Sequence, residues 1–199
     1  LAGFGLFVAG CAGAIQLNST LIGIANTLPL TPDVATLPVS VAVTDRNGML
    51  LRPFTTGDGR WRLPVERGAV DPRFIDMLIA YEDRGFAGHD GIAWGSMLRA
   101  AGQFVMAGGH VVSGGSTLTM QVARLIEGEP TRNVWGKLRQ MVHADQLERE
   151  LSKDEIIDLY LTLAPYGGNI EGIRAATLAY FGKEPGRLTM AEIALLVAL

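Results

Sequence analysis

From Asp71 to the end of the chain, apolar residues recur at helical spacing, and polar capping residues mark where helices begin. Asp71 followed by Pro72 is a strong helix-start signal. The apolar residues at i, i+3, i+4 and i+7 after this start are Phe74, Met77, Leu78 and Tyr81. The chain has 199 residues, enough for one helical core and a smaller appendage. We therefore expect residues 67–199 to form a mainly α-helical domain.

Two further helix starts carry capping boxes. Ser152 precedes Glu155 by three positions, and Thr189 precedes Glu192 by three. In a capping box the glutamate side chain binds the backbone of the cap residue. Both glutamates therefore have structural tasks, and we exclude them as catalytic candidates.

The beginning of the chain predicts a membrane segment. Its first 32 residues carry no charge, and the run LAGFGLFVAGCAGAIQL is almost wholly apolar. We expect residues 1–28 to be a transmembrane signal anchor, truncated at its start because neither Met nor a basic flank precedes it. VAGC also resembles a lipobox, so lipidation of Cys11 remains an alternative. A lone cysteine excludes an intrachain disulfide and a Cys-based zinc site.

Residues 29–66 predict a linker and a β-hairpin. Val39, Val41 and Val43 alternate as in a strand, the pair Asn47 and Gly48 suits a two-residue turn, and MLLRPF supplies a return strand. GDGRWRL is expected to add a third short strand. The net charge of −3 argues against a nucleic-acid partner, because such surfaces need clustered basic residues.

Two acids, Glu82 and Asp83, stand at the C-terminal end of the first predicted helix. The helix dipole is negative there, so basic residues would be favoured. Such a violation is expected at functional sites, although a solvated helix end is an equally open interpretation. Adjacent helix positions lie about 100° apart, so the two acids cannot enter one pocket equally. Glu82 is closer to the apolar side, and we predict that it is the reactive group and Asp83 its support.

The stretch VSGGSTLTMQVARLI predicts a glycine turn that leads into a helix. Ser116 is the expected N-cap, and Thr117, Gln121 and Arg124 align along one polar face. A helix N-terminus after a glycine turn suits an anion, because free N–H groups and the helix dipole face it. The cations that follow at further helix-like intervals are Arg132 and Lys137. A base beside such cations suggests group transfer from a phosphate-containing donor.

These segments resemble the motifs of the peptidoglycan glycosyltransferases (glycosyltransferase family 51). EDRGFAGHDG resembles the first motif, GGSTLTMQ the second, GKLRQ the third, and SKDEIIDLYLTLAPYGGNIEG the fourth and fifth. The similarity runs in order from about residue 40 to the end. It implies a lysozyme-like, two-lobed, mainly α glycosyltransferase domain with the small N-terminal β-hairpin and the membrane helix.

The resemblance implies roles for individual residues. Glu82 corresponds to the base that deprotonates the acceptor 4-hydroxyl, and Asp83 to the adjoining acid. The expected substrate-binding residues are His89, Ser116, Thr117, Gln121, Arg124, Arg132, Lys137 and Gln140. Among them, Arg124 corresponds to a basic residue that helps to hold the donor pyrophosphate. A Mg²⁺ or Mn²⁺ ion is the candidate cofactor, and no organic cofactor is expected.

Three positions depart from the family pattern. Gly136 replaces the arginine of the third motif, Gln140 replaces its glutamate, and Thr162 stands where asparagine is common. A glutamine cannot act as an acid, a base or an anionic metal ligand, so a mechanism with two carboxylates is in doubt. We interpret these changes as features of a subtype, with loss of activity as the minority interpretation.

The function implied by the resemblance is polymerisation of lipid II into β-1,4 glycan strands, with release of undecaprenyl pyrophosphate. Its partners would be lipid II, the growing strand, the lipid bilayer and a transpeptidase domain further along the same chain. The location would be the outer side of the bacterial inner membrane. In the segment AWGSMLRAAGQFVMAGGHVV, the residues Phe104, Val105 and Met106 fit bilayer contact and core packing equally well. His110 and His143 are expected to have no role in the site.

Two alternatives remain open. A lysozyme-like peptidoglycan hydrolase would also use a glutamate in a cleft, but it needs neither a cation cluster nor an anchor. A catalytically weak scaffold of the cell wall would fit the replacements at Gly136 and Gln140.

Overall fold

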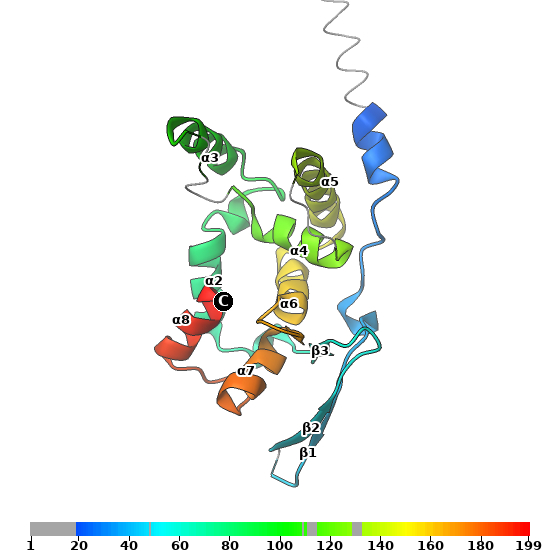
Figure 1. Cartoon of the computed structure of the whole chain (residues 1–199), viewed down its shortest axis with the longest axis vertical. Helices are drawn as coiled ribbons and strands as arrows, with labels where there is room; N and C mark the ends of the chain where they lie inside the picture. The colour runs from blue at the N-terminus through cyan, green and yellow to red at the C-terminus, as the bar shows by residue number, and fades with distance from the viewer. Residues whose placement is uncertain (1–18, 48, 109, 111–114, 129–132) are drawn as a thin grey trace, which may run out of the picture.

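The computed structural model describes residues 19–47, 49–108, 110, 115–128 and 133–199 (Figure 1). Its α-helices are a short one at residues 19–25 and then α2 (Pro72–Glu82), α3 (Trp94–Met106), α4 (Leu118–Glu127), α5 (Val134–Glu150), α6 (Lys153–Leu163), α7 (Ile173–Phe181) and α8 (Met190–Ala198). Its 3₁₀ helices are η1 (Val34–Thr36), η2 (Arg67–Ala69) and η3 (Phe86–Gly88). Its strands are β1 (Val41–Thr44), β2 (Leu50–Phe54), β3 (Trp61–Arg62) and β4 (Ile170–Glu171). The prediction of a mainly helical domain with a small hairpin is confirmed.

The helix starts lie where the caps predicted them. The Asp71 carboxylate accepts a hydrogen bond from the backbone N–H of Arg73 at 3.1 Å and caps α2. It also accepts from the backbone N–H of Leu188 at 2.9 Å, just before α8. Hydrogen bonds from the Arg73 side chain, and then from Leu188, hold the pKa of Asp71 well below its usual range. One carboxylate thus joins the start of α2 to the lead-in of α8.

Both predicted capping boxes are present. The Ser152 hydroxyl accepts from the backbone N–H of Glu155, whose side chain binds the Ser152 backbone at the start of α6. Thr189 and Glu192 form the same pair at the start of α8. The exclusion of these glutamates as catalytic candidates therefore agrees with their contacts.

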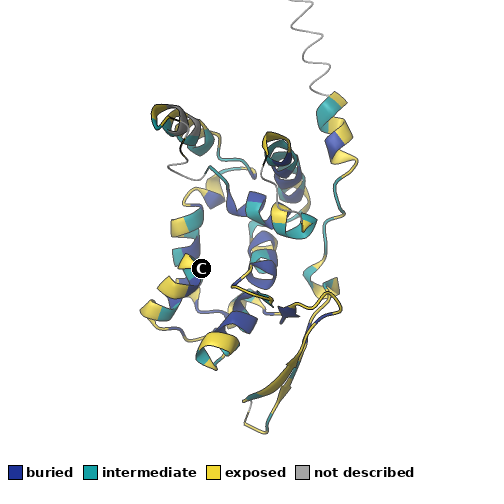
Figure 2. Ribbon diagram, viewed as in Figure 1, coloured by how far each residue is buried: buried dark blue, intermediate teal, exposed yellow. Residues whose placement is uncertain are grey.

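The hydrophobic core is built around α6, with α4 packed against both α5 and α6. Its fully buried members include Phe74, Leu118, Leu147, Ile156 and Leu159. Burying each such side chain contributes roughly 1.5–3 kcal/mol. Figure 2 shows the dark blue of buried residues along α5 and α6, whereas the hairpin is exposed on both faces. The packed helices therefore provide the rigid frame on which the candidate site is built.

The hairpin forms as expected, but its turn differs from the prediction. β1 and β2 are antiparallel, with Val41 opposite Phe54. The closing hydrogen bond runs from Asp45 N to Met49 O at 2.9 Å, so the turn is longer than two residues. The Asp45 side chain accepts from the backbone N–H groups of Asn47 and Met49, and this local alternative stabilises the longer turn. Gly48, half of the predicted turn, lies outside the described residues.

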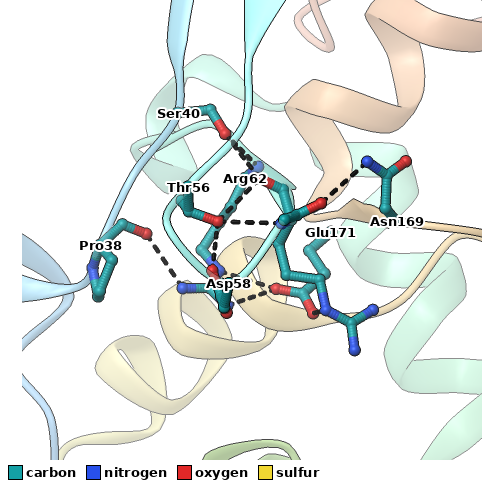
Figure 3. Close-up of polar contacts among 9 residues, drawn as sticks. Pro38, Ser40, Thr56, Asp58, Arg62, Asn169 and Glu171 are labelled. Atoms are coloured by element: carbon teal, nitrogen blue, oxygen red, sulfur yellow. Dashed lines mark hydrogen bonds and ion pairs between the residues drawn. The ribbon is translucent and has the colours of Figure 1, made fainter.

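The third predicted strand forms, but it does not extend the hairpin. β3 pairs in parallel with β4, which follows about a hundred residues later. Figure 3 shows the reason: the Arg62 guanidinium donates to the Glu171 carboxylate at 2.9 Å and to Pro38 O at 3.0 Å. Ser40 joins the hairpin base to the same strand, because its hydroxyl accepts from Arg62 N at 2.9 Å. A partly buried ion pair thus joins β3 to β4.

The end of the predicted anchor and the segment after it lie along α5 (Figure 1). Arg139 of α5 donates to Thr27 O at 2.8 Å, and the Thr31 hydroxyl donates to Glu150 at the end of α5. Residues 1–18, with most of the predicted anchor and Cys11, lie outside the described residues. Among the residues that are described, no helix is long and apolar enough to cross a membrane.

Candidate active site

The site begins at the end of α2, where the two acids take different directions. Glu82 is the last residue of α2, and its carboxylate accepts a hydrogen bond from Gln121 Nε2 of α4 at 2.6 Å. Asp83 is the C-cap of the same helix and is only 6% exposed. Helix geometry therefore separates the pair as predicted. The expectation that Glu82 is closer to the apolar side is wrong, because Asp83 lies in the interior and Glu82 is partly accessible.

Asp83 connects three parts of the chain. Its carboxylate accepts from the backbone N–H of Leu118, the first residue of α4, at 3.0 Å. His89 Nε2 lies 3.0 Å from both carboxylate oxygens. An ionised carboxylate only accepts hydrogen bonds, so this contact assigns the ring proton of His89 to Nε2. Asp83 thus fixes the end of α2 against the start of α4, the helix that supplies Gln121 to Glu82.

A cleft of about 490 Å³ opens beside these residues. Its lining includes Glu82, Asp83, Arg84, Arg99, Ser116 and Thr117. Carboxylate, guanidinium and hydroxyl groups thus meet in one hollow between α2, α3 and the start of α4. Such a set can hold a polar ligand and exchange a proton with it.

The prediction that Ser116 caps α4 is wrong. Thr117 is the N-cap, and its hydroxyl accepts from Met120 N at 3.1 Å and donates to Gly91 O at 2.6 Å. Both contacts occupy this buried hydroxyl and stabilise the fold, and because Thr117 also lines the cleft, its substrate contact stays a prediction. Ser116 is thereby released from capping, and its hydroxyl instead accepts from Lys137 Nζ of α5.

Lys137 and Arg124 form the positive side of the site. Burial, and then the positive charge of Arg124, lower the pKa of the Lys137 ammonium. Neither residue forms an ion pair with an acid in the part of the chain that the structure describes. Two neighbouring cations without a counter-ion suit a multiply charged anion. Arg132, the third predicted cation, lies outside the described residues.

Tyr160 of α6 is a site neighbour that our sequence analysis missed. Burial, and then the negative charge of Glu82, raise the pKa of Tyr160 to about 12. Arg124 acts on the same phenol in the opposite direction. The residue was hidden in the apolar helical pattern of EIIDLYLTL, and only its polar tip could have marked it as different from a core residue.

The raised pKa predicts how Tyr160 titrates. An ordinary phenol with a pKa near 10 is mostly ionised at about pH 10.5, whereas Tyr160 should remain neutral there. The pKa of Tyr160 is higher in the folded state than in the unfolded state. The contribution of the neutral Tyr160 phenol to the free energy of unfolding should therefore be complete below about pH 10 and lost as the pH rises towards about 12. Absorbance at 295 nm should therefore be nearly the same for wild type and Tyr160→Phe at about pH 10.5. A deficit of about three quarters of a phenolate in the variant, the value for an ordinary tyrosine at this pH, would contradict this.

The replaced positions of the third and fourth motifs are interior. Gln140 is buried on α5, and Gly136 is buried one turn earlier. Thr162 is fully buried, and its hydroxyl donates to Asp158 O at 2.9 Å within α6. Across the described residues, no group of three or more His, Cys, Asp or Glu side chains is placed to hold a metal ion. Mg²⁺ usually binds through one or two carboxylates together with water and substrate phosphates, so the expected Mg²⁺ or Mn²⁺ ion stays a prediction.

The two histidines that were expected to have no role in the site, and the apolar end of α3, differ in burial. His143 is fully buried, and its Nδ1 lies 2.9 Å from the Glu127 carboxylate, away from the cleft lining. His110 is exposed. Met106 is 89% exposed, which favours a surface position for this end of α3, whereas the side chains of Phe104 and Val105 lie outside the described set.

Comparison with known proteins gives the family. Residues 47–199 match the family described as transglycosylase. Penicillin-binding protein 1C of Escherichia coli K12 is 49% identical over 162 residues, 81% of this chain and 21% of that protein. Penicillin-binding protein 1A of Pseudomonas aeruginosa is 37% identical over 163 residues, 82% of this chain and 19% of that protein. The chain thus spans about a fifth of the length of these relatives. It belongs to the transglycosylase family and is a glycosyltransferase domain of the kind found in class A penicillin-binding proteins.

Proposed function

We propose that this domain polymerises lipid II into β-1,4 glycan strands and releases undecaprenyl pyrophosphate. The observation that carries the proposal is the Glu82 carboxylate, held by Gln121 at 2.6 Å, beside a cleft that Ser116 also lines. Lys137 reaches Ser116 from α5, and Arg124 adds a second positive charge near it. A base and an anion site next to each other are what this transfer requires.

The reaction is an inverting displacement. Glu82 removes the proton of the acceptor 4-hydroxyl while that oxygen attacks the anomeric carbon of the donor glycan. The bond between the anomeric carbon and the pyrophosphate oxygen breaks, and its electron pair leaves with undecaprenyl pyrophosphate. The charges of Arg124, Arg132 and Lys137 stabilise this leaving group. His89, Ser116, Thr117, Gln121 and Gln140 complete the proposed substrate-binding set. A bound Mg²⁺ or Mn²⁺ ion would add further positive charge for the leaving group.

Both substrates are lipids, so the domain should work at a bilayer. Exposed apolar side chains on α3 support this, because Trp94 is 61%, Leu98 74% and Met106 89% exposed. A membrane anchor within residues 1–28 would place the domain on the outer side of the bacterial inner membrane. The proposal includes a lysozyme-like, two-lobed fold for this domain. It also includes a transpeptidase domain in the same parent chain.

The test is an assay with labelled lipid II in detergent, with and without the inhibitor moenomycin. We expect glycan chains from the wild type and their loss when moenomycin is added. Release of reducing ends from mature peptidoglycan without use of lipid II would show a hydrolase instead. Moenomycin binding without any polymerisation would show a scaffold.

A further inference from the structure

We propose that Lys153 is a positioning residue for the transfer reaction, acting on Glu82 through the loop that follows α2. This inference rests on the proposed function. Lys153 is the first residue of α6, and its Nζ donates to His89 O at 2.6 Å. The same ammonium lies 4.5 Å from the centre of the Phe86 ring. Both contacts hold η3 and its C-cap, the segment directly after the acidic pair.

The contacts continue from this segment to the site. The His89 ring holds the Asp83 carboxylate at 3.0 Å, and Asp83 accepts from Leu118 N at the start of α4. Glu82 is the neighbour of Asp83 in the chain and the hydrogen-bond partner of Gln121 in α4. A shift of the segment from residue 83 to 89 would therefore move Glu82 relative to Gln121. Lys153 reaches this segment from a different helix, α6.

The ammonium itself is held in place. Glu148 of α5 accepts from Lys153 Nζ at 2.7 Å, and its side chain is only 7% exposed. The Thr119 hydroxyl donates to the same Glu148 oxygen at 2.5 Å, so α4 also contributes to this cluster. The Lys153 charge is thus compensated and its direction set by groups from α4 and α5.

Lys153 also occupies a position that a lysine would otherwise avoid. The N-terminus of a helix carries a partial positive charge, so a cation at the first position is unfavourable. Ser152 and Glu155 already complete the cap of α6, and Lys153 contributes nothing to that box. A local rule broken next to a functional site is expected when the residue serves that site.

The test compares Lys153→Met and Lys153→Arg with the wild-type domain in the lipid II assay. For Lys153→Met we expect kcat to fall by about tenfold or more with KM within about twofold, because a small misplacement of the base slows the chemical step. Lys153→Arg keeps donors for His89 O and Glu148 and should restore most of kcat. Lys183→Met is the matched control, since Lys183 forms a similar 2.7 Å pair with Glu192 at α8. This control should keep wild-type kinetics.

A double variant separates positioning from general stability. If Lys153 acts through His89, Lys153→Met combined with His89→Ala should cost less than the product of the two single losses. Folding of each variant is checked by circular dichroism, and if Lys153→Met does not fold, Lys153→Gln takes its place. A wild-type kcat in the folded variant, or independent losses in the double variant, would overturn the proposal. Absence of polymerisation in the wild type would instead contradict the proposed function.

Discussion

Replacement of Glu82 by Gln should reduce lipid II polymerisation by about 10² to 10⁴-fold, because general-base catalysis contributes about that much. The amide cannot remove a proton from the acceptor hydroxyl. The amide has the same shape as the carboxylate, and its oxygen can still accept from Gln121 Nε2. In the wild type this nitrogen lies 2.6 Å from the Glu82 carboxylate. The loss should therefore appear in kcat while folding stability changes little.

The matched control is Glu184→Gln, which removes a carboxylate that does not line the cleft. Glu184 pairs with Arg174 near α7, and its side chain is mostly exposed. This variant should polymerise lipid II at the wild-type rate. Near-normal glycan chain formation by Glu82→Gln would reject Glu82 as the base, and circular dichroism would show whether both variants remain folded.

The helix starts and the separation of the two acids could be predicted, because both depend on residues that are close together in the sequence. Asp71 with Pro72, and the boxes at Ser152 and Thr189, specify helix starts through contacts within four residues. Helix geometry also predicted that Glu82 and Asp83 point in different directions, and they do, but Asp83 and not Glu82 is the buried member of the pair.

The missed features depend on contacts that are distant in sequence. β3 pairs with β4, and Arg62 of β3 forms an ion pair with Glu171 of β4. Strand propensity cannot indicate a partner so distant in the sequence. Ser116 and Thr117 are both good caps, and the choice between them follows from Gly91 O and Lys137, which come from other elements. Contacts between residues distant in sequence therefore determine the partner of β3 and the N-cap of α4, which local preferences did not specify.

Replacement of Asp83 by Ala should destabilise the domain strongly. The variant leaves two buried donors without their acceptor, His89 Nε2 and the backbone N–H of Leu118. Each such loss costs about 1–3 kcal/mol, so the free energy of unfolding should fall by about 2–6 kcal/mol. Urea unfolding followed by circular dichroism measures this change. Asp145→Ala is the control, because the Asp145–Arg149 pair is exposed and such pairs contribute about 0–1 kcal/mol.

Asp83→Asn distinguishes a supporting residue from a second base. Its amide oxygen can still accept from Leu118 N, whereas the charge facing His89 is lost. If Asp83 only fixes the junction of α2 and α4, this variant should lose less stability than Asp83→Ala and keep part of the polymerisation rate. Glu82→Gln should keep a far smaller part of the polymerisation rate than Asp83→Asn, although its free energy of unfolding should change little. Equal loss of rate in folded Asp83→Asn and Glu82→Gln would mean that both carboxylates take part in the proton transfer, because an asparagine preserves the junction but cannot carry the charge.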